Sequence, residues 1–366
     1  MALTTGIVGL PNVGKSTLFN AITQAGAESA NYPFCTIDPN VGIVEVPDYR
    51  LQKLTELVEP KKTIPTAFEF TDIAGIVEGA SKGEGLGNKF LSHIRQVDAI
   101  SHVVRCFADD NITHVSGGVN PIRDIEVINL ELILADLESI EKRITRVAKL
   151  AKAKDKEAVA ELEVLELLRD AFENEKPARS VEFTDEQQKI VKHLHLLTSK
   201  PVLYVANVSE EDLLAPEDND YVKQVKEFAG AEGSQVILVC AKIESEIAEL
   251  EGEEKEMFLE EIGIKESGLD QLIRAAYDLL GLQTYFTAGV QEVRAWTFRK
   301  GTKAPQAAGI IHTDFERGFI RAEVVSYEDL VDAGTMAVAK ERGKVRLEGK
   351  EYIVQDGDVV HFRFNV

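Results

Sequence analysis

Cysteine is scarce in this sequence of 366 residues, and long apolar runs are missing. The three cysteines, Cys35, Cys106 and Cys240, are far apart and form no CxxC pair, which argues against a disulfide framework and against a zinc site. No run approaches the roughly 18 to 20 apolar residues that a membrane-spanning helix needs, and the N-terminus lacks the basic start and apolar core of a secretory signal. We therefore expect a protein of the reducing cytoplasm with no membrane partner.

Positive charge is also in short supply. The chain carries 41 Lys and Arg against 62 Asp and Glu, a net charge of −21. Residues 283–366 hold 12 of each sign, so the whole acidic excess falls on the first 282 residues and a boundary near residue 282 is indicated. The acidic balance works against nonspecific phosphate binding by the molecule as a whole. DNA is therefore not an expected partner, and any RNA contact must be local.

The order of the predicted elements indicates an α/β domain followed by a smaller one. Apolar, β-branched runs alternate with helical patterns such as residues 15–25, and this alternation predicts a parallel sheet covered by helices. The last runs crowd together in the tail, which predicts a separate strand-rich domain. The runs that predict strands are 5–9, 67–71, 99–107, 201–207, 235–240, 292–298, 319–325, 351–354 and 359–364.

Two helical patterns interrupt the strands between about residues 125 and 198. Apolar side chains recur at three- or four-residue spacing over 130–151 and over 159–172, with polar residues between them. These patterns predict a helical hairpin inserted into the α/β domain. We therefore expect one domain over residues 3–282, which contains the hairpin, and a second domain over residues 283–366.

One motif specifies chemistry. Residues 9–16, with the sequence GLPNVGKS, fit G-x-x-x-x-G-K-[ST] between a predicted strand and a predicted helix, which is the setting of a phosphate-binding P-loop. The backbone N–H groups and the positive helix end bind phosphates, Lys15 reaches the β and γ phosphates, and the Ser16 hydroxyl ligates Mg²⁺. The residues predicted to bind the nucleotide here are Asn12, Val13, Gly14, Lys15, Ser16 and Thr17.

Two further motifs complete a predicted magnesium and γ-phosphate site. Residues 72–75 (DIAG) follow a predicted strand and fit D-x-x-G, in which the Asp72 carboxylate holds the Mg²⁺ shell and the Gly75 N–H faces the γ phosphate. Thr36, in the segment PFCT, is placed to ligate Mg²⁺ when a γ phosphate is present. The predicted metal ligands are thus Ser16, Thr36 and Asp72, and Lys15 and Gly75 act on the transferred phosphate.

The base is predicted to be read at residues 207–210 (NVSE). GTPases carry N-K-x-D here, with the aspartate accepting from guanine and the lysine covering the base. This chain keeps Asn207 and lacks both the lysine and the aspartate, because Val208 and Glu210 stand in their places. Adenine offers an N6 donor beside an N7 acceptor, a pattern that an asparagine can read with both polar atoms. ATP is therefore favoured over GTP, with Asn207 and Glu210 at the base.

With these motifs the sequence resembles the Obg-like ATPases of the YchF subfamily, which are translation-factor-related P-loop NTPases. The matching segments are residues 9–16, 33–36, 72–75 with its glycine-rich continuation 79–87, 207–210 and, for a TGS domain of the β-grasp type, 283–319. The resemblance implies a Ras-like G domain with an inserted hairpin and a C-terminal TGS domain. It also implies hydrolysis of ATP in preference to GTP and the ribosome as partner.

The group that orients the attacking water is harder to identify. Many GTPases have a glutamine directly after the D-x-x-G glycine, where this chain has Ile76. His93 and His114 are the nearby imidazoles, and we favour His114 because it follows the 99–107 strand in a polar segment; the alternative is a surface histidine with no role. Asn12 matches an asparagine that coordinates K⁺ in related NTPases, which adds K⁺ to Mg²⁺ as an expected cofactor, and a structural turn asparagine is the alternative.

A basic cluster interrupts the acidic body at the predicted hairpin turn. Such a cluster is a candidate contact with the phosphate backbone of rRNA, and the alternative is pairing with flanking acids on a solvated helix. Residues 299–303 and 340–350 supply further basic loops in the tail. The cluster within residues 142–156 consists of Lys142, Arg143, Arg146, Lys149, Lys152, Lys154 and Lys156.

Two functions from different classes fit these observations. In the first, ATP and Mg²⁺ order the loops at Thr36 and Gly75 and hydrolysis releases them, so that the protein is a nucleotide-dependent switch that binds the ribosome. In the second, the protein is a ribosome- or RNA-binding protein in which the nucleotide is a slowly hydrolysed ligand. Ile76 favours the second function, whereas the intact set of phosphate and metal ligands favours the first.

Nucleotide preference is the most direct consequence of the 207–210 motif. Because the lysine and the aspartate of N-K-x-D are both replaced, we expect ATP to bind the purified protein more tightly than GTP in calorimetry. Restoring the guanine reader with Val208→Lys and Glu210→Asp is expected to shift the preference toward GTP. Equal or reversed affinities in the unsubstituted protein contradict the assignment.

Overall fold

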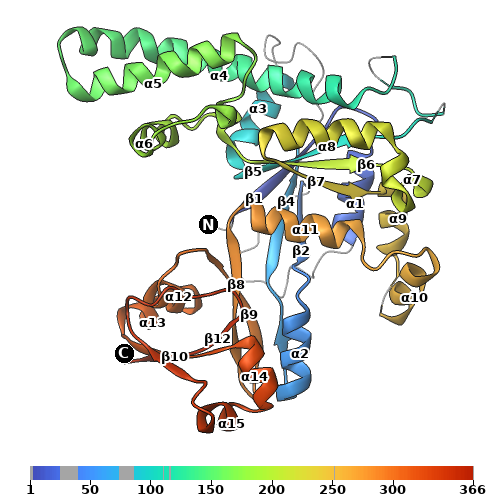
Figure 1. Ribbon diagram of the computed structural model, residues 1–366, viewed down its shortest axis with the longest axis vertical. Helices are drawn as coiled ribbons and strands as arrows, with labels where there is room; N and C mark the ends of the chain where they lie inside the picture. Colours follow the sequence, from blue (N-terminus) through green and yellow to red (C-terminus); the bar gives the residue numbers. More distant parts are fainter. Residues whose placement is uncertain are drawn as a thin grey trace. The chain divides into compact units, whose positions relative to one another are not determined.

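The computed structural model describes residues 3–24, 40–73, 86–109, 111–114, 117–250 and 252–365. The chain divides into two compact units, each shown with its elements labelled in Figure 1. The first consists of Met1–Ile43 and Glu69–Ala276, and the second of Val44–Phe68 and Tyr277–Val366. The sequence placed residues 44–68 in the first domain, whereas their packing groups them with the C-terminal unit.

A six-stranded sheet with the order β2-β4-β1-β5-β6-β7 forms the centre of the first unit. β1 pairs in parallel with β4 and β5, and β6 pairs in parallel with β5 and β7. β5 and β6 are buried along their whole length, as expected of parallel strands covered on both faces. The strands are β1 (Thr4–Val8), β2 (Val41–Glu45), β4 (Ala67–Asp72), β5 (Ala99–Arg105), β6 (Val202–Asn207) and β7 (Gln235–Val239).

Helices cover both faces of this sheet, with α8 on one side and α11 on the other (Figure 1). Because the central strands are parallel, their carboxyl ends meet at one edge, where α/β proteins bind ligands. Outside the inserted hairpin the helices are α1 (Lys15–Gln24), α3 (Leu86–Gln96), α7 (Glu210–Leu214), α8 (Asp220–Glu232), α9 (Ala241–Ile247), α10 (Glu253–Glu261) and α11 (Gly268–Leu279).

The predicted helical hairpin is present as α4 (Pro121–Lys152) and α5 (Lys156–Glu173), which run side by side away from the sheet in Figure 1. Asn120 caps α4, and Asp155 caps α5 by accepting from the Ala158 N–H at 2.9 Å. The chain returns through α6 (Asp185–Leu194), whose first turn is closed by a capping box. The buried residues that hold the insertion together include Ile140, Val147, Ala158, Val164, Leu165, Leu168, Phe172 and Val191.

The second unit is a mixed sheet with the order β11-β10-β12-β8-β9-β3 and several short helices. β12 pairs with β8 in parallel, whereas β10 pairs antiparallel with β11 and β12 and β8 pairs antiparallel with β9. Its elements are α2 (Tyr49–Val58), β3 (Thr63–Ile64), β8 (Leu282–Ala288), β9 (Val293–Arg299), α12 (Ala304–Ile311), α13 (Thr313–Arg317), β10 (Phe319–Ser326), α14 (Tyr327–Ala333), α15 (Met336–Glu341), β11 (Arg346–Glu348) and β12 (Asp358–Phe364).

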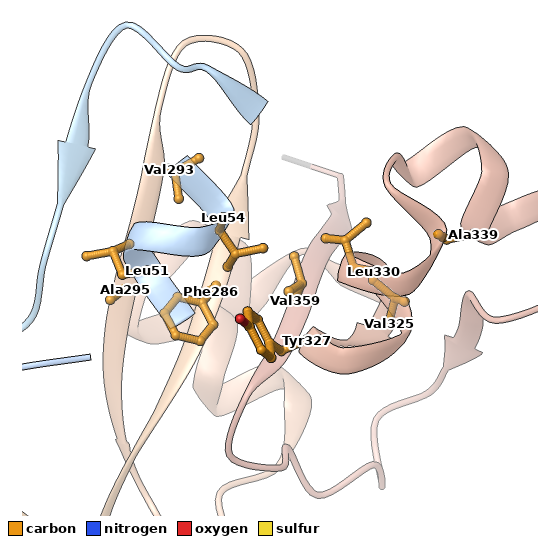
Figure 2. Packing of buried hydrophobic residues seen from close by; sticks show 11 residues of the cluster. Leu51, Leu54, Phe286, Val293, Ala295, Val325, Tyr327, Leu330, Ala339 and Val359 are labelled. Atoms are coloured by element: carbon orange, nitrogen blue, oxygen red, sulfur yellow. The ribbon is translucent and has the colours of Figure 1, made fainter. Parts of the chain in front are cut away.

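Helix α2 explains why residues 44–68 belong with the C-terminal unit. Figure 2 shows Leu51 and Leu54 of α2 facing Phe286 of β8 within one buried cluster. On the polar side, Arg50 donates to Asp356 at 2.7 Å. β3 adds a parallel edge strand by pairing with β9. Sequence patterns miss these contacts because they join segments more than 200 residues apart.

One predicted strand is absent from the structure, and a glutamate-rich segment of the first unit forms two separate helices. Residues 351–354 form no strand, and only an isolated bridge links Ile353 to Lys303, because turns at Gly349 and Gly357 flank this short run. The acidic helical pattern after residue 243 is divided into α9 and α10. Gly252, with φ 52°, stands directly before α10 and gives the chain a backbone conformation that a continuous helix does not have.

Truncation of Leu54 tests the place of α2 in the second unit. Leu54 is fully buried, so Leu54→Ala is expected to lower the free energy of unfolding of this unit by about 2–5 kcal/mol. The single tryptophan of the chain, Trp296, lies on β9 and reports urea unfolding of the same unit by fluorescence. Val290→Ala, at an exposed position, is the control and should change stability by less than about 0.5 kcal/mol. Equal midpoints for the two variants contradict the packing of α2.

Candidate functional site

The P-loop connects β1 to α1 at the carboxyl edge of the first sheet. Asn12 and Gly14 have positive φ angles of 64° and 93°, which turn the backbone back toward the helix start. A Cβ atom on Gly14 would collide with the side-chain amide of Asn207, so only glycine fits at this position. The first turn of α1 begins with the Leu18 N–H donating to the Gly14 carbonyl at 3.0 Å. The loop therefore has the strand, glycine turn and helix start that a phosphate site requires.

Lys15 and Asp72 form an ion pair that joins the P-loop to the end of β4. Lys15 is 8% exposed, and Asp72 pairs with Ile7 of β1 in the sheet register. The predicted phosphate lysine and the predicted metal-shell carboxylate therefore lie together, although the motifs are more than 50 residues apart. Ser16, one residue along, is exposed in the first turn of α1.

P-loop NTPases in general use Mg²⁺, and the residues present here fit that ion. A hydroxyl at Ser16 and a carboxylate at Asp72 are hard oxygen donors, and Mg²⁺ in such sites takes only one or two protein ligands beside phosphates and water. The described residues contain no cluster of three or more His, Cys, Asp or Glu side chains that could hold a metal ion. Thr36 and Gly75 lie outside the described residues.

Asn207 connects the P-loop to the loop that follows β7. Its Nδ2 donates to the Val13 carbonyl at 2.9 Å, and its Oδ1 accepts from the Ala241 N–H at 3.0 Å. Both contacts are buried. One N–H of the amide and one lone pair of its oxygen are thus already used. The sequence predicted that Asn207 reads adenine with both polar atoms, and both atoms would then serve two partners at once. Asn207 can still offer its second N–H to a base.

Glu210, the residue at the aspartate position of N-K-x-D, forms an ion pair with Lys242. This hydrogen bond raises the pKa of Lys242. Lys242 follows Cys240 and Ala241 at the start of α9, so residues 207–210 and the loop after β7 lie together. The pair is solvent-exposed and contributes little to stability. Glu210 is the first residue of α7, shortly after the carboxyl end of β6, and its carboxylate can accept a further hydrogen bond.

Arg105 organises the segment that leads to His114. This residue ends β5, is 1% exposed, and donates to three backbone carbonyls: Nε to Phe107 at 3.1 Å, Nη1 to Ile112 at 2.9 Å and Nη2 to Asp109 at 3.1 Å. Arg105 was not among the site residues predicted from the sequence. The available signal was the one permanently charged side chain in the mostly apolar 99–107 run, because a buried guanidinium needs several acceptors.

The segment that Arg105 holds contacts the P-loop directly. Asn12 Nδ2 donates to the Thr113 carbonyl at 3.1 Å, which places residue 113 beside the P-loop. The next residue, His114, is therefore close to the predicted phosphate site although it is 102 positions away from Asn12 in the sequence. His93 lies on α3, and its Nδ1 is buried with no hydrogen-bond partner.

His114 is buried with the first turn of α4. Its side chain is 3% exposed, and Nε2 lies 2.8 Å from Oδ2 of Asp124, which is 2% exposed. Arg123 Nη2 lies 3.5 Å from His114 Nδ1 and 3.2 Å from Asp124 Oδ1. His114 is therefore not a surface histidine, which was the alternative prediction for its position. Asp124 is a second residue that the sequence analysis did not select, because its partner is set by the fold.

The other predicted nucleotide residues divide by exposure. Val13 is buried and contributes its carbonyl to Asn207, whereas Thr17 is exposed in the first turn of α1. The two cysteines near this edge, Cys106 and Cys240, are free and buried. Burial raises the pKa of Cys106 to about 12 and raises that of Cys240 as well, so both stay protonated thiols at neutral pH.

The basic cluster of residues 142–156 lies around the turn between α4 and α5. Two of its seven members are paired: Lys142 with Glu138 and Arg143 with Glu161. The exposed apolar side chain of Leu150 lies among the others. Within the described part of the chain, the members that form no ion pair are Arg146, Lys149, Lys152, Lys154 and Lys156. We call these five residues the cationic apex.

The basic residues of the second unit are mostly neutralised. Glu323 accepts from Lys340 and from Arg363 at 2.8 Å, and these hydrogen bonds lower its pKa to about 2. Arg342 and Lys344 likewise pair with aspartates at 2.9 Å. The 340–350 loop is thus a poorer candidate for contact with a phosphate backbone than the cationic apex. Among the helices described here, none is long and apolar enough to cross a membrane.

Known proteins with this sequence pattern share both units. The profile of the 50S ribosome-binding GTPases matches residues 4–208, and that of the YchF GTPase C-terminal domain, described as a protein of unknown function, matches residues 282–365. The ribosome-binding ATPase YchF of Bacillus subtilis is 80% identical and that of Haemophilus influenzae 59% identical, each over 366 residues that cover 100% of both chains. The solved structure of the Schizosaccharomyces pombe YchF GTPase, 42% identical, superposes with a TM-score of 0.87 over 99% of this chain and 97% of its own.

Proposed function

The chain belongs to the YchF family, and on that basis we propose that it is a Mg²⁺-dependent ATPase that binds the ribosome and acts as a nucleotide-dependent switch. The proposed hydrolysis of ATP rests on the contact of Lys15 with Asp72 at the P-loop. This contact brings a phosphate-binding lysine and a carboxylate of the magnesium shell to one point. The relatives named as ribosome-binding ATPases support both the reaction and the partner. A ribosomal partner places the protein in the cytoplasm.

Preference for ATP over GTP rests on the base-reading edge. Glu210 has one more methylene group than the aspartate of N-K-x-D and is held by Lys242, and Val208 offers no charge or amine to cover a base. Asn207 supplies one remaining N–H as a donor, which suits the N7 or N1 acceptor of adenine. The pairing of Glu210 with Lys242 leaves an acceptor for the adenine N6 donor.

Hydrolysis requires that the γ phosphate be bound and that the negative charge developing on it be stabilised. Lys15 leaves Asp72 to bind the β and γ phosphates, and the P-loop N–H groups of residues 12–17 surround them. Ser16, Thr36 and Asp72 would hold Mg²⁺, and a bound Mg²⁺ would supply positive charge to the phosphate oxygens. Gly75 donates its N–H to the γ phosphate. In each case the protein contributes placement and electrostatics and forms no covalent bond.

Two groups replace the missing glutamine in this proposal. Ile76 cannot orient water, so His114, beside the P-loop contact of Thr113, takes that role as the catalytic imidazole. Asn12 donates through Nδ2 to Thr113, which leaves its Oδ1 as a ligand for K⁺ next to the phosphates. A cation there would stabilise the negative charge that develops on the γ phosphate, as an arginine finger does.

The cationic apex is the proposed contact with rRNA. Five cations without ion pairs at the end of a helical hairpin, with the exposed Leu150 among them, form a local positive surface on a chain of net charge −21. This arrangement fits the expectation that nucleic-acid contact must be local. The alternative, a binding protein in which the nucleotide turns over slowly, shares this surface and differs in whether the ribosome accelerates hydrolysis.

Charge reversal at the apex tests the proposed function. We expect ribosomes to raise ATP turnover of the unsubstituted protein by about tenfold or more, since a missing catalytic donor costs roughly a hundredfold to a thousandfold in rate. Lys149→Glu with Lys152→Glu should keep the basal rate and lose most of this stimulation. The matched control is Lys189→Glu with Lys192→Glu, which reverses two exposed lysines at the same spacing on α6.

Turnover and ribosome sedimentation are measured for all three proteins, with Lys15→Ala as the hydrolysis background. Ribosome binding without any stimulation supports the slow-ligand alternative. No turnover above the Lys15→Ala background, with or without ribosomes, contradicts an ATPase. Equal loss of ribosome binding in the α6 control places the contact outside the cationic apex.

A further inference from the structure

The buried pair of His114 and Asp124 fixes the protonation pattern of the imidazole. An ionised carboxylate only accepts hydrogen bonds, so Nε2, 2.8 Å from Asp124 Oδ2, must carry the proton and donate it. Nδ1 then has a lone pair in the neutral ring. The guanidinium of Arg123, which only donates, lies on the Nδ1 side at 3.5 Å, in agreement with this tautomer. Both neighbours therefore select the same form of His114.

Asp124 itself is held in one orientation. It belongs to the first turn of α4, where its N–H donates to the Asn120 carbonyl at 3.1 Å, and its side chain is almost fully buried. Arg123 Nη2 donates to Oδ1 at 3.2 Å and to the Gly118 carbonyl at 2.6 Å, so the two carboxylate oxygens have different partners. One oxygen serves the arginine and the other serves the histidine.

We propose that Asp124 is a positioning residue for ATP hydrolysis, which fixes His114 as the Nε2–H tautomer and so keeps Nδ1 as the acceptor for the attacking water. The inference rests on the proposed catalytic role of His114. A rotation of the ring that keeps its hydrogen bond to Asp124 would turn Nδ1 toward the attacking water without changing the tautomer. The 3.5 Å contact of Nδ1 with Arg123 is at the outer limit of a hydrogen bond, so water can replace it.

The substitution Asp124→Asn reverses the tautomer without changing the shape of the side chain. Because Arg123 donates to Oδ1, the amide oxygen of the asparagine stays at that position and its NH₂ group turns toward His114 Nε2. Nε2 must then accept, and the proton moves to Nδ1. A ring in this form has no acceptor to offer water, which is how an orienting aspartate acts in triads of unrelated enzymes.

The test combines ¹⁵N spectra of the histidine rings with steady-state kinetics in the full-length protein. The His114 signal is assigned by its loss in His114→Ala, among the seven histidines of the chain. We expect the Nε2–H pattern in the unsubstituted protein and the Nδ1–H pattern in Asp124→Asn. The kcat for ATP should fall by about tenfold or more while KM changes by less than about twofold.

Glu126→Gln is the matched control, since it removes the same charge from an exposed position in the same turn of α4. It should leave the tautomer and kcat unchanged. Arg123→Ala should keep the Nε2–H pattern, because Asp124 still accepts from His114. An Nδ1–H pattern in the unsubstituted protein overturns the inference without any variant, so the test does not depend on the stability of Asp124→Asn.

The kinetics separate this inference from the proposed function on which it rests. If His114→Ala retains full kcat, the catalytic role of His114 fails, and the role of Asp124 in hydrolysis fails with it. If His114→Ala is slow and Asp124→Asn retains full kcat, only the positioning role of Asp124 is overturned. Slow turnover in both variants, with the reversed tautomer in Asp124→Asn, supports the inference.

Discussion

The side-chain amide of Asn207 is the contact on which the nucleotide edge depends. Its two hydrogen bonds, to the Val13 carbonyl and the Ala241 N–H, join the phosphate loop to the loop beside the base. The absence of a Cβ atom at Gly14 allows the amide to approach so closely that no side chain fits there. Asn207, the proposed base contact, is thus also the group that sets the distance between the phosphate loop and the loop after β7.

A single helix connects this edge to the inserted hairpin. α4 holds Asp124 against His114 in its first turn and ends at the cationic apex after 32 residues, about 48 Å of helix. Between these ends, Asp136 accepts from the N–H groups of Leu197 and Thr198 at 2.9 and 2.8 Å, which ties α4 to the segment that enters β6. The cationic apex and the carboxylate that holds His114 therefore lie at opposite ends of one helix.

The P-loop could be predicted from a local sequence pattern, because residues 9–16 form one continuous segment from the end of a strand to the first turn of a helix. The hairpin could be predicted equally well, since the apolar spacing over 130–151 and 159–172 comes from two helices that pack on each other. The membership of residues 44–68 in the C-terminal unit was not, because Leu51 and Leu54 carry no mark of their distant partner Phe286. Asp124 was missed because its pairing with His114 is set by the fold, whereas Arg105 left one signal, an arginine in a mostly apolar run.

The substitution Asn207→Asp tests the central role of this amide most directly, because it keeps the shape and replaces the Nδ2 donor with an oxygen that faces the Val13 carbonyl. Binding of ATP and ADP is measured by calorimetry, and Trp296 fluorescence confirms that the second unit stays folded. We expect the affinity for both nucleotides to fall by about tenfold or more, since a buried acceptor without its donor costs roughly 1–3 kcal/mol. Unchanged affinity for both would contradict the account.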